Sequence, residues 1–126
     1  MGTRSTPTDQ TIVSIRADGV ELEGLLGIPP GARGIVVFAH GSGSGRLSPR
    51  NNAVAGALRT AGIATLLLDL LTEEEATDRR LVFDIPFLAT RLRAAAEWVR
   101  TSAATRQLAI GYFGASTGAA VALQAA

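Results

Sequence analysis

A serine between two glycines, Ser116, is the residue of this chain whose type and spacing best fit covalent chemistry. Residues 114–118 read G-A-S-T-G, a G-x-S-x-G pattern with Ser116 at its centre. Where a strand turns directly into a helix, glycines at these positions avoid collisions, and strained backbone angles expose the serine hydroxyl. A helix that begins there also points free N–H groups at developing negative charge. We predict that Ser116 is a nucleophile; the alternative is an ordinary turn in which it caps the helix.

A second glycine-rich segment, residues 40–45 (H-G-S-G-S-G), follows the first long apolar run. Ester chemistry at a serine passes through a tetrahedral oxyanion, which needs two N–H donors that converge on it. Glycines let the backbone approach without interference from side chains. We predict that the backbone N–H groups of Thr117 and Ser42 form this oxyanion hole. Supporting roles in the two turns are expected of His40, Gly41, Gly43, Gly114 and Gly118.

Two other interpretations of the glycine-rich segment fit the residues less well. A dinucleotide site requires G-x-G-x-x-G after the first strand of its unit, but Arg46 replaces the third glycine, although Asp69 resembles a ribose-binding acid. A phosphate-binding P-loop requires a lysine, and the chain has none. With one histidine and no cysteine, zinc sites built on cysteine and metal sites built on several histidines are excluded. We therefore expect no cofactor and no metal.

The elements that must position these residues can be read from the hydropathy pattern. Alternating residues on both sides of Asp18-Gly19 predict an antiparallel hairpin. Continuous apolar runs predict three strands that are covered on both faces, as in a parallel sheet. The hairpin strands are expected at 11–16 and 20–28, and the buried strands at 34–39, 63–68 and 108–113.

Three helices are expected between and after these strands. Ser48 and Pro49 provide an N-cap and a first helical residue, and Gly62 a C-cap. Asp84 is placed to cap a second helix, and the third helix covers 119–126. The acidic stretch 72–80 is expected to be a loop or short solvated turn. The apolar positions of the first helix are Val54, Ala57, Leu58 and Ala61, and those of the second are Ile85, Leu88, Leu92, Ala95 and Val99.

A hairpin followed by alternating strands and helices predicts an α/β fold with a mostly parallel sheet and flanking helices. In such sheets ligands bind beyond the carboxyl ends of the strands, so the loops at 40–47, 69–80 and 114–118 are expected to share one edge. The last helix has no C-terminal stop signal and no strand after it. We therefore expect a partial architecture that is cut after the helix behind Ser116.

Composition limits the class of protein. The chain has 126 residues, of which 47% are hydrophobic and 18% charged, so we expect one folded domain over 11–126 behind a disordered tail, residues 1–10. The net charge is +1 and the basic residues are scattered, which argues against nucleic-acid binding. No stretch approaches the roughly 20 apolar residues of a membrane span, and no secretory leader is present, so the expected location is the cytoplasm.

Three stretches of the chain resemble the dienelactone hydrolase-like branch of the α/β-hydrolase superfamily. They are FAHGSGSGRLSPRNNAVAGALRTAGIATLLLDLLTEEE, RLVFDIPFLATRLRAAAEWV and IGYFGASTGAAVALQAA. The resemblance covers the chain from about Ile12 and implies a Ser-His-Asp hydrolase with Ser116 as nucleophile and the segment after His40 as oxyanion loop. Dienelactone hydrolases proper carry cysteine in place of this serine, so a small carboxyl ester is the expected substrate. Some bacterial relatives carry such a domain fused to a phosphoribosyltransferase.

The chain departs from the family pattern after the nucleophile. In the superfamily the triad acid and histidine follow on later strands, so both are expected from a missing C-terminal half or a partner chain. His40 lies on the oxyanion side in that pattern, where orienting the loop is a better interpretation than general-base duty. Asp69 and Asp84 are expected to be a strand-end loop residue and a helix cap. Alone, the chain should be inactive or very weak as an esterase.

The family pattern also bears on assembly. It places the strand Leu108 to Phe113 inside the sheet, beside 34–39 and a strand that this chain lacks, so here it becomes an apolar edge. We expect association through this edge and the helix Ala119 to Ala126, either with the complementary half or with a second copy. An alternative to enzymatic function is a non-catalytic, truncated hydrolase module that serves in assembly or binding.

Overall fold

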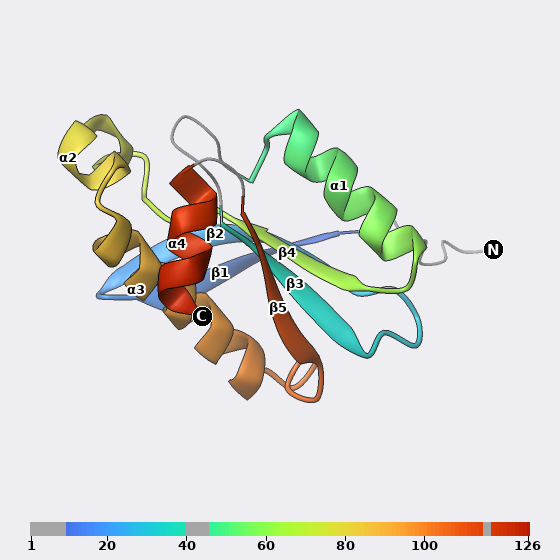
Figure 1. The fold of residues 1–126 in the computed structure, drawn as a ribbon. Coiled ribbons are helices and arrows are strands. Elements are labelled where there is room, and N and C mark those ends of the chain that lie inside the picture. Colours follow the sequence, from blue (N-terminus) through green and yellow to red (C-terminus); the bar gives the residue numbers. More distant parts are fainter. Residues whose placement is uncertain (1–9, 40–45, 115–116) are drawn as a thin grey trace.

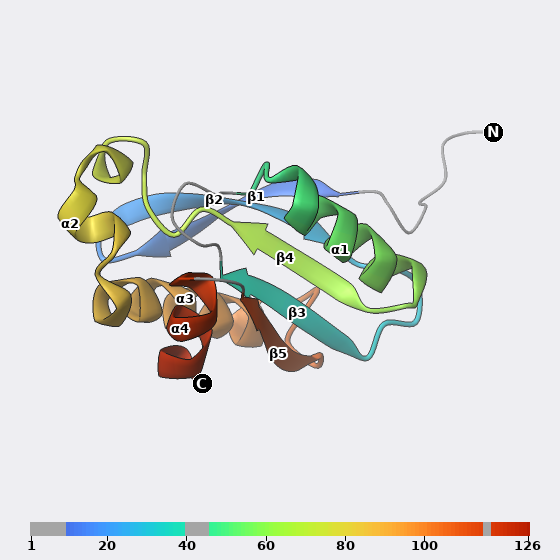
Figure 2. The ribbon, with the colours of Figure 1, turned by 45° about the horizontal axis from the view of Figure 1, so that its top comes forward.

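The computed structural model of the chain describes residues 10–39, 46–114 and 117–126, which form one five-stranded sheet with helices on both faces (Figures 1 and 2). The expected tail, apart from Gln10, lies outside the described residues. The strands are β1 (Thr11–Ala17), β2 (Val20–Gly27), β3 (Gly34–Ala39), β4 (Ala64–Leu68) and β5 (Ala109–Gly114). The helices are α1 (Pro49–Thr60), α2 (Arg79–Val82), α3 (Ile85–Thr101) and α4 (Thr117–Ala125), with a 3₁₀ turn η1 (Glu75–Thr77) before α2.

The sheet has the order β1-β2-β4-β3-β5 and is mixed. β1 pairs with β2 and β2 with β4 in antiparallel fashion, whereas β3 lies parallel to both β4 and β5. The predicted hairpin is confirmed, and its turn has φ 50° at Asp18 and φ 79° at Gly19. Positive φ at both central residues matches the right-handed twist of the flanking strands. The α/β prediction is confirmed, with the parallel arrangement confined to β4, β3 and β5.

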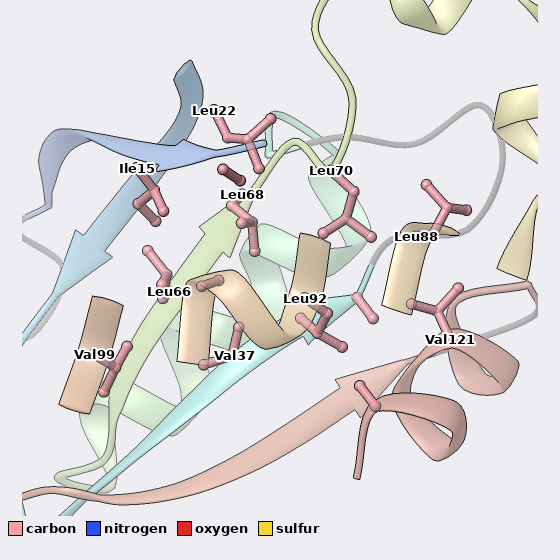
Figure 3. Packing of buried hydrophobic residues seen from close by; sticks show 14 of the residues in the cluster. Ile15, Leu22, Val37, Leu66, Leu68, Leu70, Leu88, Leu92, Val99 and Val121 are labelled. Carbon is pink, nitrogen blue, oxygen red and sulfur yellow. The ribbon is translucent and has the colours of Figure 1, made fainter. Parts of the chain in front are cut away.

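Two apolar layers hold the helices to the two faces of the sheet. Side chains alternate between the faces of a strand, so Leu66 and Leu68 of β4 point to one face and Leu67 to the other. The larger layer packs α3 and α4 against the sheet, with Leu92, Val99 and Val121 shown among its residues in Figure 3. The smaller layer, Phe38, Ala55 and Leu67, packs α1 on the opposite face. Each fully buried leucine contributes about 1.5–3 kcal/mol to this packing.

Helix α1 begins and ends where its cap residues predict. Ser48 Oγ accepts from the Asn51 N–H at 3.3 Å, and Gly62 follows the helix with φ 91°. The predicted inward face is wrong in part, because Ala57 and Ala61 are exposed. The buried positions are instead Asn51, Ala55 and Arg59, with Val54 and Leu58 half-buried beside them. Arg59 can be buried because its Nη1 donates to Thr65 Oγ1 of β4 at 2.8 Å.

Helix α3 confirms the prediction made from Asp84 and the apolar spacing. The Asp84 carboxylate accepts from the Phe87 N–H at 3.0 Å, which satisfies one free donor of the first turn. The expected apolar residues face the sheet, since Leu88, Leu92, Ala95 and Val99 are buried and Ile85 is half-buried. These contacts fix α3 against one face of the sheet.

Candidate active site

The carboxyl ends of β3 and β5 lie side by side in the sheet. Ala39, the last residue of β3, is the register partner of Gly114, the last residue of β5, and β4 pairs along the other side of β3. The segment that begins at His40 and the turn that leads to Ser116 therefore leave the sheet at neighbouring points, as the sequence predicts. His40, Gly41, Ser42, Gly43 and Ser116 themselves lie outside the described residues, so the roles given to them stay predictions.

The start of α4 comes too close to the end of β5 to leave room for a side chain at Gly114. A Cβ placed on Gly114 would collide with the backbone carbonyl of Gly118 and would lie 2.8 Å from the nitrogen of Ala119. Gly118 is buried, and Thr117 is the first residue of α4. The first N–H groups of any α-helix have no acceptor within the helix. A strand before Ser116, a helix after it and a close approach between the two are thus present, as a G-x-S-x-G pattern needs.

Arg46, the residue directly after the glycine-rich segment 40–45, contacts β2, α1 and the loop after β4. The Arg46 N–H donates to Asp69 Oδ1 at 2.6 Å, and its Nη1 lies 3.3 Å from Asp69 Oδ2. Nη2 of Arg46 lies 2.6 Å from Glu23 Oε1 in β2, and Asn52 Nδ2 of α1 donates to the Arg46 carbonyl at 2.8 Å. Both oxygens of Asp69 are therefore in contact with Arg46. Asp69 directly follows β4, so its predicted place in the loop after that strand is confirmed. No local sequence signal predicts these contacts of Arg46.

The loop after β4 is held by a buried arginine of α3. Arg91 donates to both carboxylate oxygens of Glu75 at 2.9 and 2.8 Å, to the Leu70 carbonyl at 3.0 Å and to Asp18 at 3.2 Å. Its guanidinium also lies 4.6 Å from the ring centroid of Phe87. The hydrogen bonds from Arg91 lower the pKa of Glu75 from 4.5 to about 2, against the opposing effect of burial. In turn, Glu75 raises the pKa of Arg91.

This loop is more ordered than the sequence suggests. The stretch 72–80 was expected to be a loop or a short solvated turn, whereas residues 75–77 form η1 and α2 begins at Arg79. The N–H of Thr72 donates to Glu75 Oε1 at 3.0 Å, and the N–H of Glu75 donates to Thr72 Oγ1 at 3.1 Å. This reciprocal pair is a capping box, for which the T-E-E-E sequence is the available signal. It positions the Glu75 carboxylate for Arg91.

Among the residues that the structure describes, no group of three or more histidine, cysteine, aspartate or glutamate side chains could hold a metal ion. Within the same ranges, no helix is long and apolar enough to cross a membrane.

Comparisons with known proteins give relatives that are longer than this chain. No family model matches. Proteins of Mycobacterium tuberculosis strains H37Rv and CDC 1551, each named as a candidate phosphoribosyl transferase, are 55% identical to it over 114 residues. That match covers 90% of this chain and 26% of each relative, so the chain spans about a quarter of the length of these curated proteins.

Solved structures share the fold closely. A dienelactone hydrolase from Anabaena variabilis is 53% identical, with a TM-score of 0.91 over 94% of this chain and 56% of that one. An esterase from Pyrococcus furiosus has the same fold at 23% identity, with a TM-score of 0.73 over 98% of this chain and 50% of the esterase. The chain therefore has a partial α/β-hydrolase fold, which corresponds to roughly the N-terminal half of an α/β-hydrolase chain such as this dienelactone hydrolase.

Proposed function

We propose that this chain supplies the nucleophile and the oxyanion hole of a serine hydrolase that acts on carboxyl esters. The observation that carries the proposal is the turn at Gly114, where the backbone of α4 comes so close that no side chain fits. Such a turn is what lifts a serine above the sheet in a nucleophile elbow. The pairing of Ala39 with Gly114 supports it further, because the predicted oxyanion segment starts beside that elbow.

The proposed reaction is acyl transfer to Ser116. Its hydroxyl oxygen attacks the ester carbonyl carbon while a base accepts the proton, and the resulting oxyanion accepts hydrogen bonds from the N–H groups of Thr117 and Ser42. Collapse of the intermediate expels the alcohol, which takes the proton from the protonated base, and leaves an acyl-enzyme. Water activated by the same base then releases the acid and frees Ser116.

The base and its partner acid are proposed to come from residues outside this chain. Both oxygens of Asp69 contact Arg46, and the Asp84 carboxylate caps α3, so neither acid is engaged as a triad member in the described structure. A histidine and an acid on later strands of the completed hydrolase domain would fill these roles. His40 is proposed to orient the oxyanion segment.

The substrate class follows from the bond that is cleaved. A lactone is a cyclic carboxyl ester, so the 53% identity to a dienelactone hydrolase supports an ester or lactone substrate for the completed protein. The phosphoribosyl transferase name of the mycobacterial relatives favours a second candidate: a hydrolase-like module that serves assembly or binding within a larger enzyme. The two functions differ in whether Ser116 reacts.

The edge of β5 is the proposed site of completion. In the described part of the chain β5 pairs with β3 alone, and Ile110, Tyr112 and Phe113 on it are half-buried. An unpaired strand edge offers a row of N–H and C=O groups to another strand. We propose that the complementary half of the domain pairs there, with a second copy of this chain as the alternative.

The test uses a fluorophosphonate, which reacts with activated serines, on the completed protein. We expect label on Ser116 and loss of nearly all turnover of p-nitrophenyl acetate in Ser116→Ala, with Ser14→Ala, an exposed serine of β1, as the matched control. Label on another serine while Ser116 stays free would overturn the assignment.

The chain alone should lose a factor on the order of 10³–10⁶ in rate. Strong turnover by the chain alone that His40→Ala abolishes would make His40 the base.

A further inference from the structure

The segment between β4 and α3, residues 71–83, contains η1 and α2 and forms its backbone hydrogen bonds within itself. The N–H donors are Ala76, Thr77, Asp78, Leu81 and Val82, and every acceptor is a carbonyl within residues 72–78. No side chain of the segment is buried, and of its apolar side chains only Leu71 packs against the larger apolar layer. Segment 71–83 is therefore a local unit on the surface of the domain rather than a part of its core.

One residue, Arg91 of α3, attaches this unit to the rest of the described chain. Its Nη1 and Nη2 donate to Glu75 Oε1 and Oε2 at 2.9 and 2.8 Å. In the described ranges, no other residue beyond the two ends of the segment forms a hydrogen bond or an ion pair with it. The Arg91 side chain is 2% exposed, so this contact is shielded from water, unlike the exposed ion pairs on the surface.

Arg91 has further partners that do not belong to segment 71–83. Its Nε lies 3.2 Å from Asp18 Oδ2 in the hairpin turn, and its Nη1 donates to the Leu70 carbonyl at 3.0 Å. Its guanidinium also lies over the Phe87 ring. A buried charge that loses every partner is strongly destabilising. Because Asp18 and Leu70 remain in place, the departure of Glu75 does not leave Arg91 in that condition.

The unit has little structure that could persist after it detaches. The turn η1 has 3 residues and α2 has 4, and isolated helices shorter than about 12–15 residues are marginal in water. Detachment and unfolding of the segment are thus expected to occur together, as one local opening. The flanking residues stay anchored, since Leu70 is buried in the core and the Asp84 carboxylate caps α3.

The position of the unit gives the opening a function. Segment 71–83 follows β4 and lies beyond the carboxyl ends of the parallel strands (Figures 1 and 2). Ligands of such sheets bind at this edge. From these contacts we infer that residues 71–83 form a lid that opens as one unit at the end of the sheet where substrate enters, and that the Arg91–Glu75 contact is its latch. The control of substrate entry rests on the proposed function, whereas the opening itself does not.

Hydrogen exchange of the completed protein, followed by mass spectrometry, measures the opening. In Glu75→Gln, which weakens the latch, the amides of 71–83 should exchange about 10- to 100-fold faster and by similar factors, because a hydrogen bond to a charged group is lost. Exchange in the β1–β2 hairpin and in residues 95–101 of α3 should not change. The matched control is Asp18→Asn, which takes a carboxylate from the same arginine but not from the lid, and should stay within about threefold of the unmodified protein.

Arg91→Lys provides a second way to weaken the latch if Glu75→Gln does not fold. Lysine keeps the positive charge but cannot donate to both carboxylate oxygens in the planar geometry of arginine. Faster exchange confined to 71–83 is expected again.

Two esters of different size measure the control of substrate entry. The ratio of kcat/KM for p-nitrophenyl octanoate to that for p-nitrophenyl acetate should rise at least about threefold in Glu75→Gln, because the longer acyl chain needs the lid open more often. In Asp18→Asn this ratio should equal that of the unmodified protein.

The outcomes separate this inference from the proposed function. If exchange at 71–83 is no faster in the latch variants than in Asp18→Asn, or rises equally throughout α3, no lid opens and the inference is overturned. If the lid opens but the ester ratio is constant, its control of substrate entry is overturned. If Ser116 of the unmodified protein takes no label and turns over no ester, the proposed function fails and substrate control fails with it, while exchange still decides whether the lid opens.

Discussion

Replacement of Glu75 by glutamine should measure how much the buried ion pair between Glu75 and Arg91 contributes to the free energy of unfolding. Arg91 is 2% exposed at its side chain, and Glu75 supplies two of its hydrogen bonds. Glu75→Gln keeps the shape of the side chain and one acceptor oxygen but removes the charge. Asp18, which is 59% exposed, then remains as the only carboxylate that contacts Arg91 in the described structure. A buried charge that loses its partner is strongly destabilising.

The magnitude follows from the pKa of Glu75. Its fall from 4.5 to about 2 corresponds to about 3 kcal/mol of stability at pH 7, which solvent screening of a side chain that is 21% exposed reduces to about 2 kcal/mol. The folded-state pKa is depressed, so this stability is fully present above about pH 4.5 and is lost as the pH falls toward 2. At pH 3 the free energy of unfolding of the variant should therefore lie closer to that of the unmodified protein, with a difference less than half of the one at pH 7.

Urea denaturation followed by circular dichroism at pH 7, 5 and 3 measures this directly. The matched control is Glu97→Gln, which breaks an exposed pair with Arg100 and should cost less than about 0.5 kcal/mol at every pH. If Glu75→Gln lowers the free energy of unfolding equally at pH 7 and pH 3, or by no more than the control does, the buried Glu75–Arg91 pair does not stabilise the loop as argued here.

Three other predictions follow from the fold. Gly114→Ala should lower the free energy of unfolding by about 1–3 kcal/mol through backbone overlap, whereas Gly111→Ala on the same strand, whose added Cβ meets nothing within 4 Å, should not; equal effects in thermal melts would contradict this. Asp84→Ala should cost about 1 kcal/mol by removing the cap of α3, and Asp84→Ser should recover most of it in the same melts. By light scattering, this chain alone should associate through β5, and a monomer at all concentrations would argue against an open edge.

Local signals explain why so much of the fold could be predicted. The hairpin turn depends on Asp18-Gly19, the start of α1 on Ser48, and the start of α3 on Asp84, and each acts within a few residues. Strands β3 and β4 were recognisable because both of their faces are covered, which leaves no polar alternation. The same expectation is wrong for β5, in which Ala109 and Gly111 are exposed. Strand order is not local, and the place of β5 beside β3 came from the family resemblance.

The features that the sequence did not predict depend on contacts between residues that are far apart in the chain or on faces that the local pattern leaves ambiguous. Helix α1 has small apolar residues on several sides, so its pattern alone could not show that Arg59 is buried against Thr65 while Ala57 is exposed. The Arg46–Asp69 and Glu75–Arg91 contacts join residues 23 and 16 positions apart. Opposite charges at such separations have many possible partners in a sequence, and only the fold selects one. The candidate site was therefore predicted by its motif, but the side chains that support it were not.

The strand order has a consequence for how the protein is made. Four of the five strands lie between Thr11 and Leu68, whereas α3 and β5 follow only after the long connection that begins at Asp69. At about 5–20 residues per second, a ribosome needs several seconds to add them. During that time β3, apolar along most of its length, is the edge of a four-stranded sheet, and the face that α3 will cover is open to water. We expect the nascent chain to be a substrate for chaperones in this interval, until residues 109–114 pair with β3.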